Sequence, residues 1–153
     1  MVHLSTSKMK IYLDVCCLCR PFDDQSTGRI RLEVTAVQEI IRRCAAQEFT
    51  LVTSEAITEE ISRIPDIKKR LRVKKIVSGS HEHIVIDEII VSRMNELITE
   101  GGDAMDSLHV ACAERAGAIF LTTDDDLITF FKSNQLIQLC IENPVIWLKE
   151  ENK

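Results

Sequence analysis

Short apolar segments alternate with segments of helical periodicity along nearly the whole chain, and this alternation restricts the fold more than any other feature. The first apolar segment, Ile11–Leu13, continues through Val15–Leu18 with little polar alternation, as in a strand covered on both faces, and Pro21 ends it. Further strands are expected at Thr50–Thr53, His83–Ile86, Ala118–Thr122 and Leu136–Ile141.

Apolar residues three or four positions apart predict helices between these strands. The expected helices follow Ser26 as far as Ala45, follow Ser54 as far as Ile64, begin near Asp66, cover Asp87–Thr99 and Asp103–Ala116, follow Asp124, and begin at Pro144. Strands that alternate with helices in this way predict an α/β fold with a mostly parallel sheet.

The composition is that of one ordinary globular domain. The chain has 153 residues, of which 45% are apolar and 28% are charged. No run of about 18 apolar residues occurs, so no membrane span is expected. Residues 1–10 lack the apolar core of a signal peptide. We therefore expect a cytoplasmic protein, with an N-terminal extension at 1–9 and one domain at 10–150.

Six cysteines are present, and in a chain without an export signal they are expected to be reduced thiols that pack as small apolar side chains. They are Cys16, Cys17, Cys19, Cys44, Cys112 and Cys140. The alternative is metal or redox chemistry, because the first three resemble part of a zinc-binding knuckle. A closed zinc site needs about four ligands, however, and no second Cys/His cluster follows.

Several carboxylates occur within apolar patterns, where they are costly. Asp14 interrupts the first strand, and Asp124 follows a buried strand at its carboxyl end, the edge at which ligands bind in open α/β sheets. Glu60 shares the apolar stripe of its helix with Ile57, Ile61 and Ile64, whereas Glu59 is expected to face solvent.

Two more acids begin a later helix. Asp103 and Asp106 are three residues apart and share a face, and His109 lies three residues further on. Buried carboxylates cost several kcal/mol each unless they are compensated, so the whole set suggests a bound cation. Oxygen ligands favour Mg²⁺ or Mn²⁺, and such sites usually catalyse phosphoryl displacement. Each acid alone could also be a helix cap or an ion-pair partner, and His109 a packed, hydrogen-bonded core residue.

Charge is distributed unevenly. Residues 1–76 contain 14 Lys and Arg against 10 Asp and Glu, a net charge of +4, and residues 77–153 contain 5 against 14, a net charge of −9. The most basic segment places six cations within eight residues: Lys68, Lys69, Arg70, Arg72, Lys74 and Lys75. Such a run suits a phosphate backbone, but a solvated helix face is the alternative.

Competing chemistries lack their motifs. The sequence contains no G-x-G-x-x-G or G-x-x-x-x-G-K-[ST] loop for nucleotide phosphates and no G-x-S-x-G nucleophile elbow.

Four segments together resemble a PIN domain of the kind found in toxins of bacterial and archaeal toxin–antitoxin pairs. They are Ile11-Tyr12-Leu13-Asp14, the segment from Ser54 to Arg63 that contains Glu60, Asp106-Ser107-Leu108-His109-Val110-Ala111-Cys112-Ala113, and Leu121-Thr122-Thr123-Asp124-Asp125-Asp126-Leu127. The resemblance extends from about Lys10 to Leu148. It implies a three-layer α/β/α sandwich with Mg²⁺- or Mn²⁺-dependent endoribonuclease activity.

The resemblance also assigns roles to residues. The family's acidic quartet corresponds to Asp14, Glu60, Asp106 and Asp124, with Thr122 as a hydroxyl near the metal and Asp103 as an optional extra. RNA is the implied substrate, and the charge of the Lys68–Lys75 segment, noted above, makes that segment the expected contact for the RNA backbone. An antitoxin protein and a second copy of the chain are the implied partners.

One departure from the family pattern keeps a second hypothesis open. PIN domains commonly have a small polar residue and then Asn or Ser after the first Asp, whereas Val15 and Cys16 follow Asp14 here. A thiol is a weak hydrogen-bonding group. The alternative to a nuclease is therefore a non-catalytic PIN-scaffold module that binds RNA or a protein.

Overall fold

The computed structural model describes residues 8–135 and 137–153 and contains one five-stranded sheet. The strand order is β3-β2-β1-β4-β5, and each neighbouring pair is parallel. The strands are β1 (Lys10–Leu13), β2 (Thr50–Ser54), β3 (Glu82–Ile84), β4 (Ile119–Leu121) and β5 (Ile141–Glu142). The predicted α/β class with a parallel sheet is confirmed.

Helices connect these parallel strands. They are α1 (Val15–Cys19), α2 (Gly28–Ala45), α3 (Glu55–Ser62), α4 (Ile67–Val77), α5 (Glu88–Thr99), α6 (Ala104–Ala116), α7 (Asp125–Ser133) and α8 (Pro144–Glu151), with a 3₁₀ turn, η1 (Arg20–Phe22), after α1. Each α-helix begins after a side chain that accepts a hydrogen bond from a first-turn amide, which satisfies a donor that the helix itself leaves unpaired. Gly117 ends α6 at a positive φ of 67°, a conformation that favours glycine.

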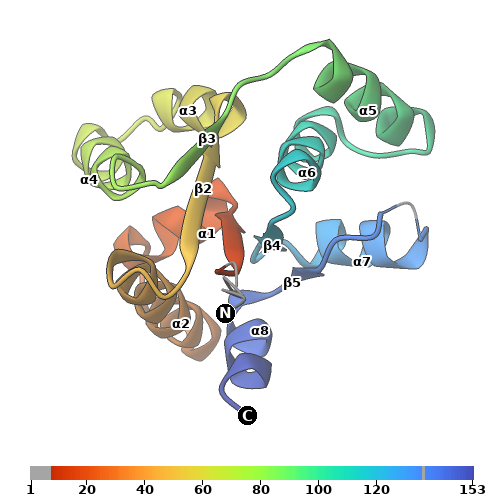
Figure 1. The fold of residues 1–153 in the computed structure, drawn as a ribbon. Helices are drawn as coiled ribbons and strands as arrows, with labels where there is room; N and C mark the ends of the chain where they lie inside the picture. The colour runs from red at the N-terminus through yellow and green to blue at the C-terminus, as the bar shows by residue number, and fades with distance from the viewer. Residues whose placement is uncertain (1–7, 136) are drawn as a thin grey trace, which may run out of the picture.

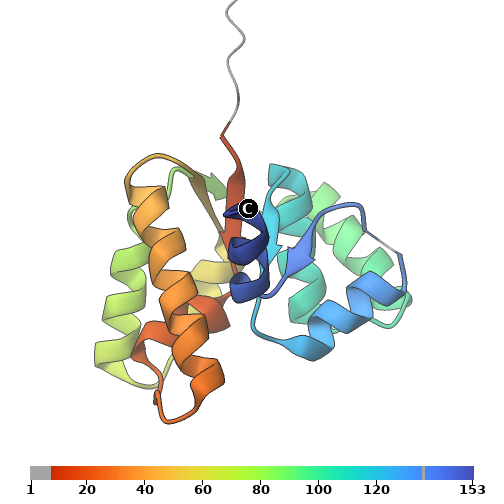
Figure 2. The same cartoon turned by 90° about the horizontal axis from the view of Figure 1, so that it is seen from below.

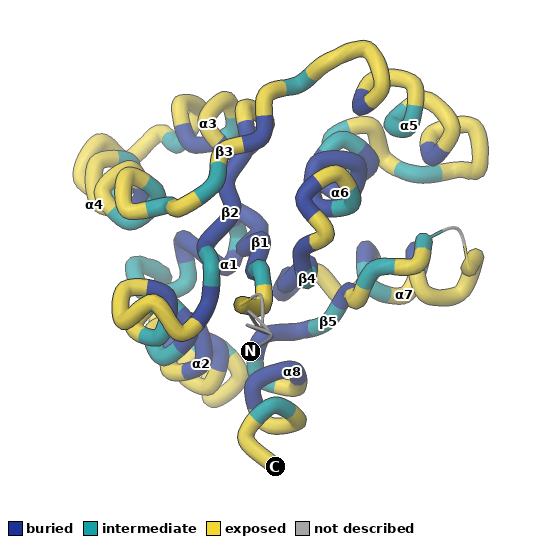
Figure 3. Tube along the Cα trace, viewed as in Figure 1, coloured by how far each residue is buried: buried dark blue, intermediate teal, exposed yellow. Residues whose placement is uncertain are grey.

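Two layers of helices enclose the sheet. α2 and α4 lie on one side, and α5, α6 and α7 lie on the other (Figures 1 and 2). α3 follows β2 directly and packs against both α4 and α6, so it lies across the edge of the sheet. The buried residues follow the central strands and α6 (Figure 3). This is the expected three-layer sandwich.

The prediction that the first strand continues through Leu18 is wrong. Asp14 ends β1 and caps α1, four of whose five residues are buried. A short helix that is buried on nearly every side produces the same unbroken apolar pattern as a buried strand, so periodicity could not separate the two.

Smaller corrections concern the ends of elements. α2 is capped by Thr27 rather than Ser26. β3 covers Glu82–Ile84 rather than His83–Ile86. β5 begins only at Ile141; of the predicted strand Leu136–Ile141, Leu136 lies outside the described residues and residues 137–140 are not in a strand.

All six cysteines are free. Cys17, Cys19, Cys44 and Cys112 are buried, as expected for small apolar side chains. Cys140 is exposed, which contradicts that expectation, and Cys16 is half-buried.

No helix in the described part of the chain is both long and apolar enough to cross a membrane. The N-terminal extension at 1–9 stays a prediction, since residues 1–7 lie outside the described ranges.

Candidate metal centre

The carboxyl ends of neighbouring strands bring polar side chains together at one edge of the sheet. Asp14 directly follows β1, and Thr122 directly follows the adjacent β4. The Asp14 amide donates a hydrogen bond to the Leu121 carbonyl at 3.0 Å, which ties the two strand ends together. The topology therefore fixes the distance between two residues that are far apart in the sequence.

Asp14 is held by three hydrogen-bond donors. Its Oδ1 accepts from the Val15 amide at 2.8 Å, and its Oδ2 accepts from the Thr122 hydroxyl at 2.9 Å and from the Cys16 thiol at 3.4 Å. The residue is only 8% exposed, and this burial raises the pKa of Asp14 against the opposing effects of His109 and Thr122. The carboxylate is thus oriented firmly, but its charge is not fully compensated by protein groups.

Cys16 takes part in this network despite its weak hydrogen-bonding capacity. Besides Asp14, its sulfur contacts the Thr122 hydroxyl oxygen at 3.3 Å and accepts from the Thr123 amide at 3.4 Å. The thiol therefore occupies a polar position between the ends of β1 and β4, the place where the family pattern has a polar side chain.

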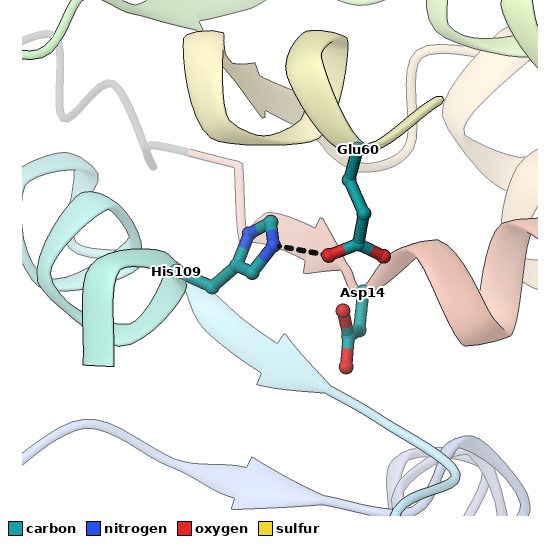
Figure 4. A group of neighbouring side chains, drawn as sticks. All are labelled: Asp14, Glu60 and His109. Carbon is teal, nitrogen blue, oxygen red and sulfur yellow. Dashed lines mark hydrogen bonds and ion pairs between the residues drawn. The ribbon is translucent and has the colours of Figure 1, made fainter. Parts of the chain in front are cut away.

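Glu60 faces this edge from α3, as its spacing predicts. Its side chain is 33% exposed, and its Oε1 accepts a hydrogen bond from Nε2 of His109 at 2.9 Å (Figure 4). Glu59, one position earlier, is exposed and forms an ion pair with Arg63 at 2.8 Å.

Asp14, Glu60 and His109 form the central cluster of the site. The three side chains come from the end of β1, from α3 and from α6, and they converge on one point (Figure 4). One ligand atom of each lies within 4.8 Å of the others. Two carboxylates and one imidazole at such separations could ligate a divalent cation.

Asp106 and Asp124 line a shallow pocket of about 250 Å³, together with Asp103. Burial raises the pKa of Asp106 to about 7, and the charges of Asp103, Asp14 and Asp124 add to the effect. The charges of Asp14 and Asp124 therefore both act on Asp106, and with Asp103 and Asp126 in its lining the pocket carries an excess of negative charge.

The outer acids also have local roles in helix capping. Asp103 accepts from the Asp106 amide and caps α6, while Asp124 Oδ1 accepts from the amides of Asp126 and Leu127 and caps α7. Thr122 accepts from the Asp124 amide at 3.1 Å, which links that cap to Asp14. Among the described residues, the cluster within 4.8 Å contains none of the three outer acids.

The family model described as the PIN domain matches residues 11–131. The chain belongs to the PIN domain family. The resemblance seen in its motifs is thereby confirmed, and the acids described above lie within the matched residues.

Solved structures show the same fold at low sequence identity. FitAcB from Neisseria gonorrhoeae has 17% identity and a TM-score of 0.58, covering 88% of this chain and 97% of that one. FitAB bound to an IR36 DNA fragment has 18% identity and a TM-score of 0.57, covering 88% and 95%. PAE2754 from Pyrobaculum aerophilum has 11% identity and a TM-score of 0.54, covering 95% and 91%. None of the curated protein sequences matches this PIN domain significantly.

The basic segment of this PIN domain forms α4, which packs against α1 and α3 beside the acidic edge. Its six cations are not equivalent. Lys69 forms an ion pair with Asp23 at 2.7 Å, Arg70 donates to the Ile64 carbonyl at 2.8 Å, and the Arg72 guanidinium lies 5.8 Å from the centre of the Phe22 ring. Lys68, Lys74 and Lys75 are exposed.

Sequence reasoning did not identify two residues behind the cluster. Tyr12 contacts Nδ1 of His109 at 2.6 Å, and Ser54 contacts the Tyr12 hydroxyl at 2.7 Å. His109 is a packed, hydrogen-bonded core residue, which was the alternative that the sequence left open for it. It also contacts the acidic site through Glu60. A phenol inside an apolar strand was the available signal, because a buried hydroxyl usually has a partner.

Proposed function

We propose that this PIN domain is a Mg²⁺- or Mn²⁺-dependent endoribonuclease that hydrolyses phosphodiester bonds in RNA. The observation that carries the proposal is the convergence of Asp14 and Glu60 beside Asp106, whose pKa is raised in part by its acidic neighbours. A carboxylate cluster of this kind is unfavourable unless a cation or protons compensate it.

The donor set fits such a cation. Carboxylate oxygens are the ligands that Mg²⁺ and Mn²⁺ prefer, and Asp14, Glu60, Asp106 and Asp124 would hold the metal. A bound metal of this class supplies a Lewis acid that activates water and stabilises the leaving oxygen. Glu60 orients the attacking water, Thr122 and Cys16 keep Asp14 in position, and Asp103 adds to the negative field.

The exposed cations of α4 are the proposed contact for the RNA backbone. Lys68, Lys74 and Lys75 lie free of the ion pair and the carbonyl contact that engage Lys69 and Arg70. Because α4 packs beside α1 and α3, an RNA strand bound to α4 would extend toward the acidic edge. Arg72 contributes from its position over Phe22.

A role as the toxin of a toxin–antitoxin pair, acting in the cytoplasm, is part of the same proposal. It is supported by the family and by the fold shared with FitAcB and with FitAB bound to DNA. The proposed partners are an antitoxin protein and a second copy of this chain.

A cleavage assay with two neighbouring glutamates tests the proposal. Wild type should cut labelled RNA in Mn²⁺ and not in EDTA. Glu60→Gln should reduce the rate by roughly two orders of magnitude or more, because a positioned catalytic group is removed. Glu59→Gln is the matched control and should cleave at nearly the wild-type rate, since Glu59 is exposed and paired with Arg63.

Three results would count against this proposal. Equal losses in the two variants, or cleavage that persists in EDTA, would separate activity from the acidic cluster. RNA binding without any cleavage in Mn²⁺ would favour the non-catalytic PIN-scaffold module instead.

A further inference from the structure

A chain of four hydrogen-bonded side chains leads from the protein interior to the acidic cluster. Ser54 Oγ lies 2.7 Å from the Tyr12 hydroxyl, which lies 2.6 Å from Nδ1 of His109, and Nε2 of His109 lies 2.9 Å from Oε1 of Glu60. The four residues come from β2, β1, α6 and α3. This series of hydrogen bonds therefore connects Glu60 to the centre of the sheet.

The two residues in the middle of this hydrogen-bonded series, Tyr12 and His109, are held rigidly. Tyr12 is fully buried and His109 is 1% exposed. The Tyr12 ring is stacked on Phe120 with centroids 5.4 Å apart, and the imidazole packs edge-on against it at 5.8 Å. Neither ring can turn without disturbing the core. The position of Nε2 is thus set by packing before Glu60 contacts it.

The direction of the hydrogen bonds follows from the groups at the two ends. An ionised Glu60 carboxylate can only accept, so Nε2 of His109 must carry a proton. In a neutral imidazole, Nδ1 then accepts from Tyr12, and the Tyr12 oxygen accepts from Ser54. Ser54 Oγ in turn accepts from the Ile57 amide at 3.1 Å.

The same conclusion holds for a protonated imidazole. Nδ1 then donates to the Tyr12 oxygen, Tyr12 donates to Ser54, and Nε2 still donates to Glu60. In both states the nitrogen that faces the acidic cluster carries a hydrogen atom. It therefore has no lone pair to offer a metal, although His109 belongs to the cluster whose ligand atoms lie within 4.8 Å of one another.

We propose that His109 is a positioning residue, which fixes the Glu60 carboxylate through its Nε2 hydrogen, and that it is not a metal ligand. Oε1 of Glu60 is then held by the protein, and Oε2 would be the oxygen available to a cation or its water. The cation is left with oxygen donors alone, which favours Mg²⁺ and Mn²⁺ over metals that seek imidazole. The role given to Glu60 in this inference rests on the proposed function. The position of the hydrogen on the imidazole does not depend on that function.

The first experiment observes the imidazole directly. The ¹⁵N spectrum of wild-type protein at pH 8 should show a protonated Nε2 on His109, and it should stay protonated when Mg²⁺ is added. Loss of the Nε2 proton on Mg²⁺ addition, or an unprotonated Nε2 without metal, would overturn the proposal. Glu60→Gln provides the assignment control, because it should perturb the Nε2 signal.

The second experiment uses two replacements of the same residue. In His109→Gln the amide nitrogen can take the place of Nε2 and donate to Glu60, whereas in His109→Asn the shorter amide reaches only the Nδ1 position. We expect His109→Asn to lower Mn²⁺ affinity or cleavage about 10- to 100-fold, the usual cost of removing such a partner, and His109→Gln to stay within about threefold of wild type. Equal losses in both would indicate a ligand or a purely structural residue and would overturn the proposal.

The two proposals fail differently. If wild type neither binds Mn²⁺ nor cuts RNA, the proposed function is wrong, while the ¹⁵N spectrum still decides the state of His109. If wild type binds Mn²⁺ and cuts RNA, and His109→Asn is folded and equals it in both, the function stands and the positioning role is wrong.

Discussion

Among the single residues of the acidic edge, Asp106 is one whose negative charge lowers the stability of the folded protein. Burial and the charges of Asp103, Asp14 and Asp124 raise its pKa to about 7, from an ordinary value of 3.8. The folded protein thus binds this proton more tightly than the unfolded chain does. Its stabilising contribution is full below about pH 4 and disappears as the pH rises through about 7.

Asp106→Asn should therefore melt higher than wild type at pH 8 in EDTA, and the difference should shrink at pH 5. Melting curves at the two pH values measure this. Asp24→Asn, on the exposed loop before α2, controls for the removal of one negative charge. A variant that melts lower than wild type at pH 8 would show that the Asp106 charge is stabilised by its surroundings.

The residues of the site differ in how far the sequence could specify them. The helical spacing of Glu60 with Ile57, Ile61 and Ile64 was enough to predict that it, and not Glu59, faces the site. Helical spacing could not predict the contacts of Cys16 with Asp14 and Thr122, or the contact of His109 with Tyr12. They depend on distances between elements, which a pattern within one helix or strand does not contain.

At the scale of elements, α4 separates structural cations from available ones. The helix face with Lys69 and Arg70 contacts Asp23 and the Ile64 carbonyl, so alanine substitutions there would confuse folding with binding. Lys68 and Lys75 are exposed. They provide the cleaner test of an RNA-binding role.

The double variant Lys68→Gln/Lys75→Gln should weaken RNA binding and flatten its salt dependence. For single-stranded RNA, the slope of log K against log[salt] should fall in magnitude by about 0.7 for each phosphate that the variant no longer neutralises. Binding titrations at several salt concentrations measure the slope. The control Lys149→Gln/Lys153→Gln removes two exposed cations from the C-terminal end, and an identical slope change there would leave α4 as a solvated face.

The elements themselves were predictable where their signals were long or capped. α5 and α6 were placed within a residue of their bounds, because each has a periodic apolar face and an aspartate cap. α1 was not predicted, because its five residues are mostly buried and too few to show a helical periodicity. β5 was overestimated, because an apolar loop and an apolar strand of this length are alike in sequence.

For the molecule as a whole, the fold determines where the unevenly distributed charges lie. α2 and α4 lie on one side of the sheet and α5, α6 and α7 on the other, while α3 lies across its edge (Figure 1). The basic α4 and the acidic helices α5 to α7 are therefore on different sides of the sheet, although β3 and α8 of the second half pack against β2 and α2 of the first. The acidic edge lies between α4 and these acidic helices, where RNA held by α4 would meet the carboxylates.

The alternation of elements predicted the fold class but not the strand order, because many parallel orders satisfy the same alternation. The family motifs named the acids of the site but no strand order, and the structure shows which of them meet: Asp14 and Glu60 lie together with His109. Only the structure shows that Asp14 both caps α1 and belongs to the cluster, whereas Asp103 and Asp124 cap helices outside it.

Asp14 is the residue on which the proposed divalent metal site most depends. Asp14→Asn keeps the shape of the side chain and its capping oxygen, and it removes a buried charge whose pKa is raised by burial. In EDTA it should therefore melt no lower than wild type. Mn²⁺ at about 100 times its dissociation constant should stabilise wild type by about 2.7 kcal/mol, and so raise its melting temperature by about 5–10 °C.

The decisive measurement is the Mn²⁺-induced shift in melting temperature of wild type and Asp14→Asn, each compared with its own value in EDTA. Asp24→Asn serves as the control and should shift like wild type. We expect a shift of several degrees for wild type and a much smaller one for Asp14→Asn. Equal shifts in the two proteins would contradict the proposed metal site, because Mn²⁺ would then bind elsewhere and Asp14 would be only the cap of α1.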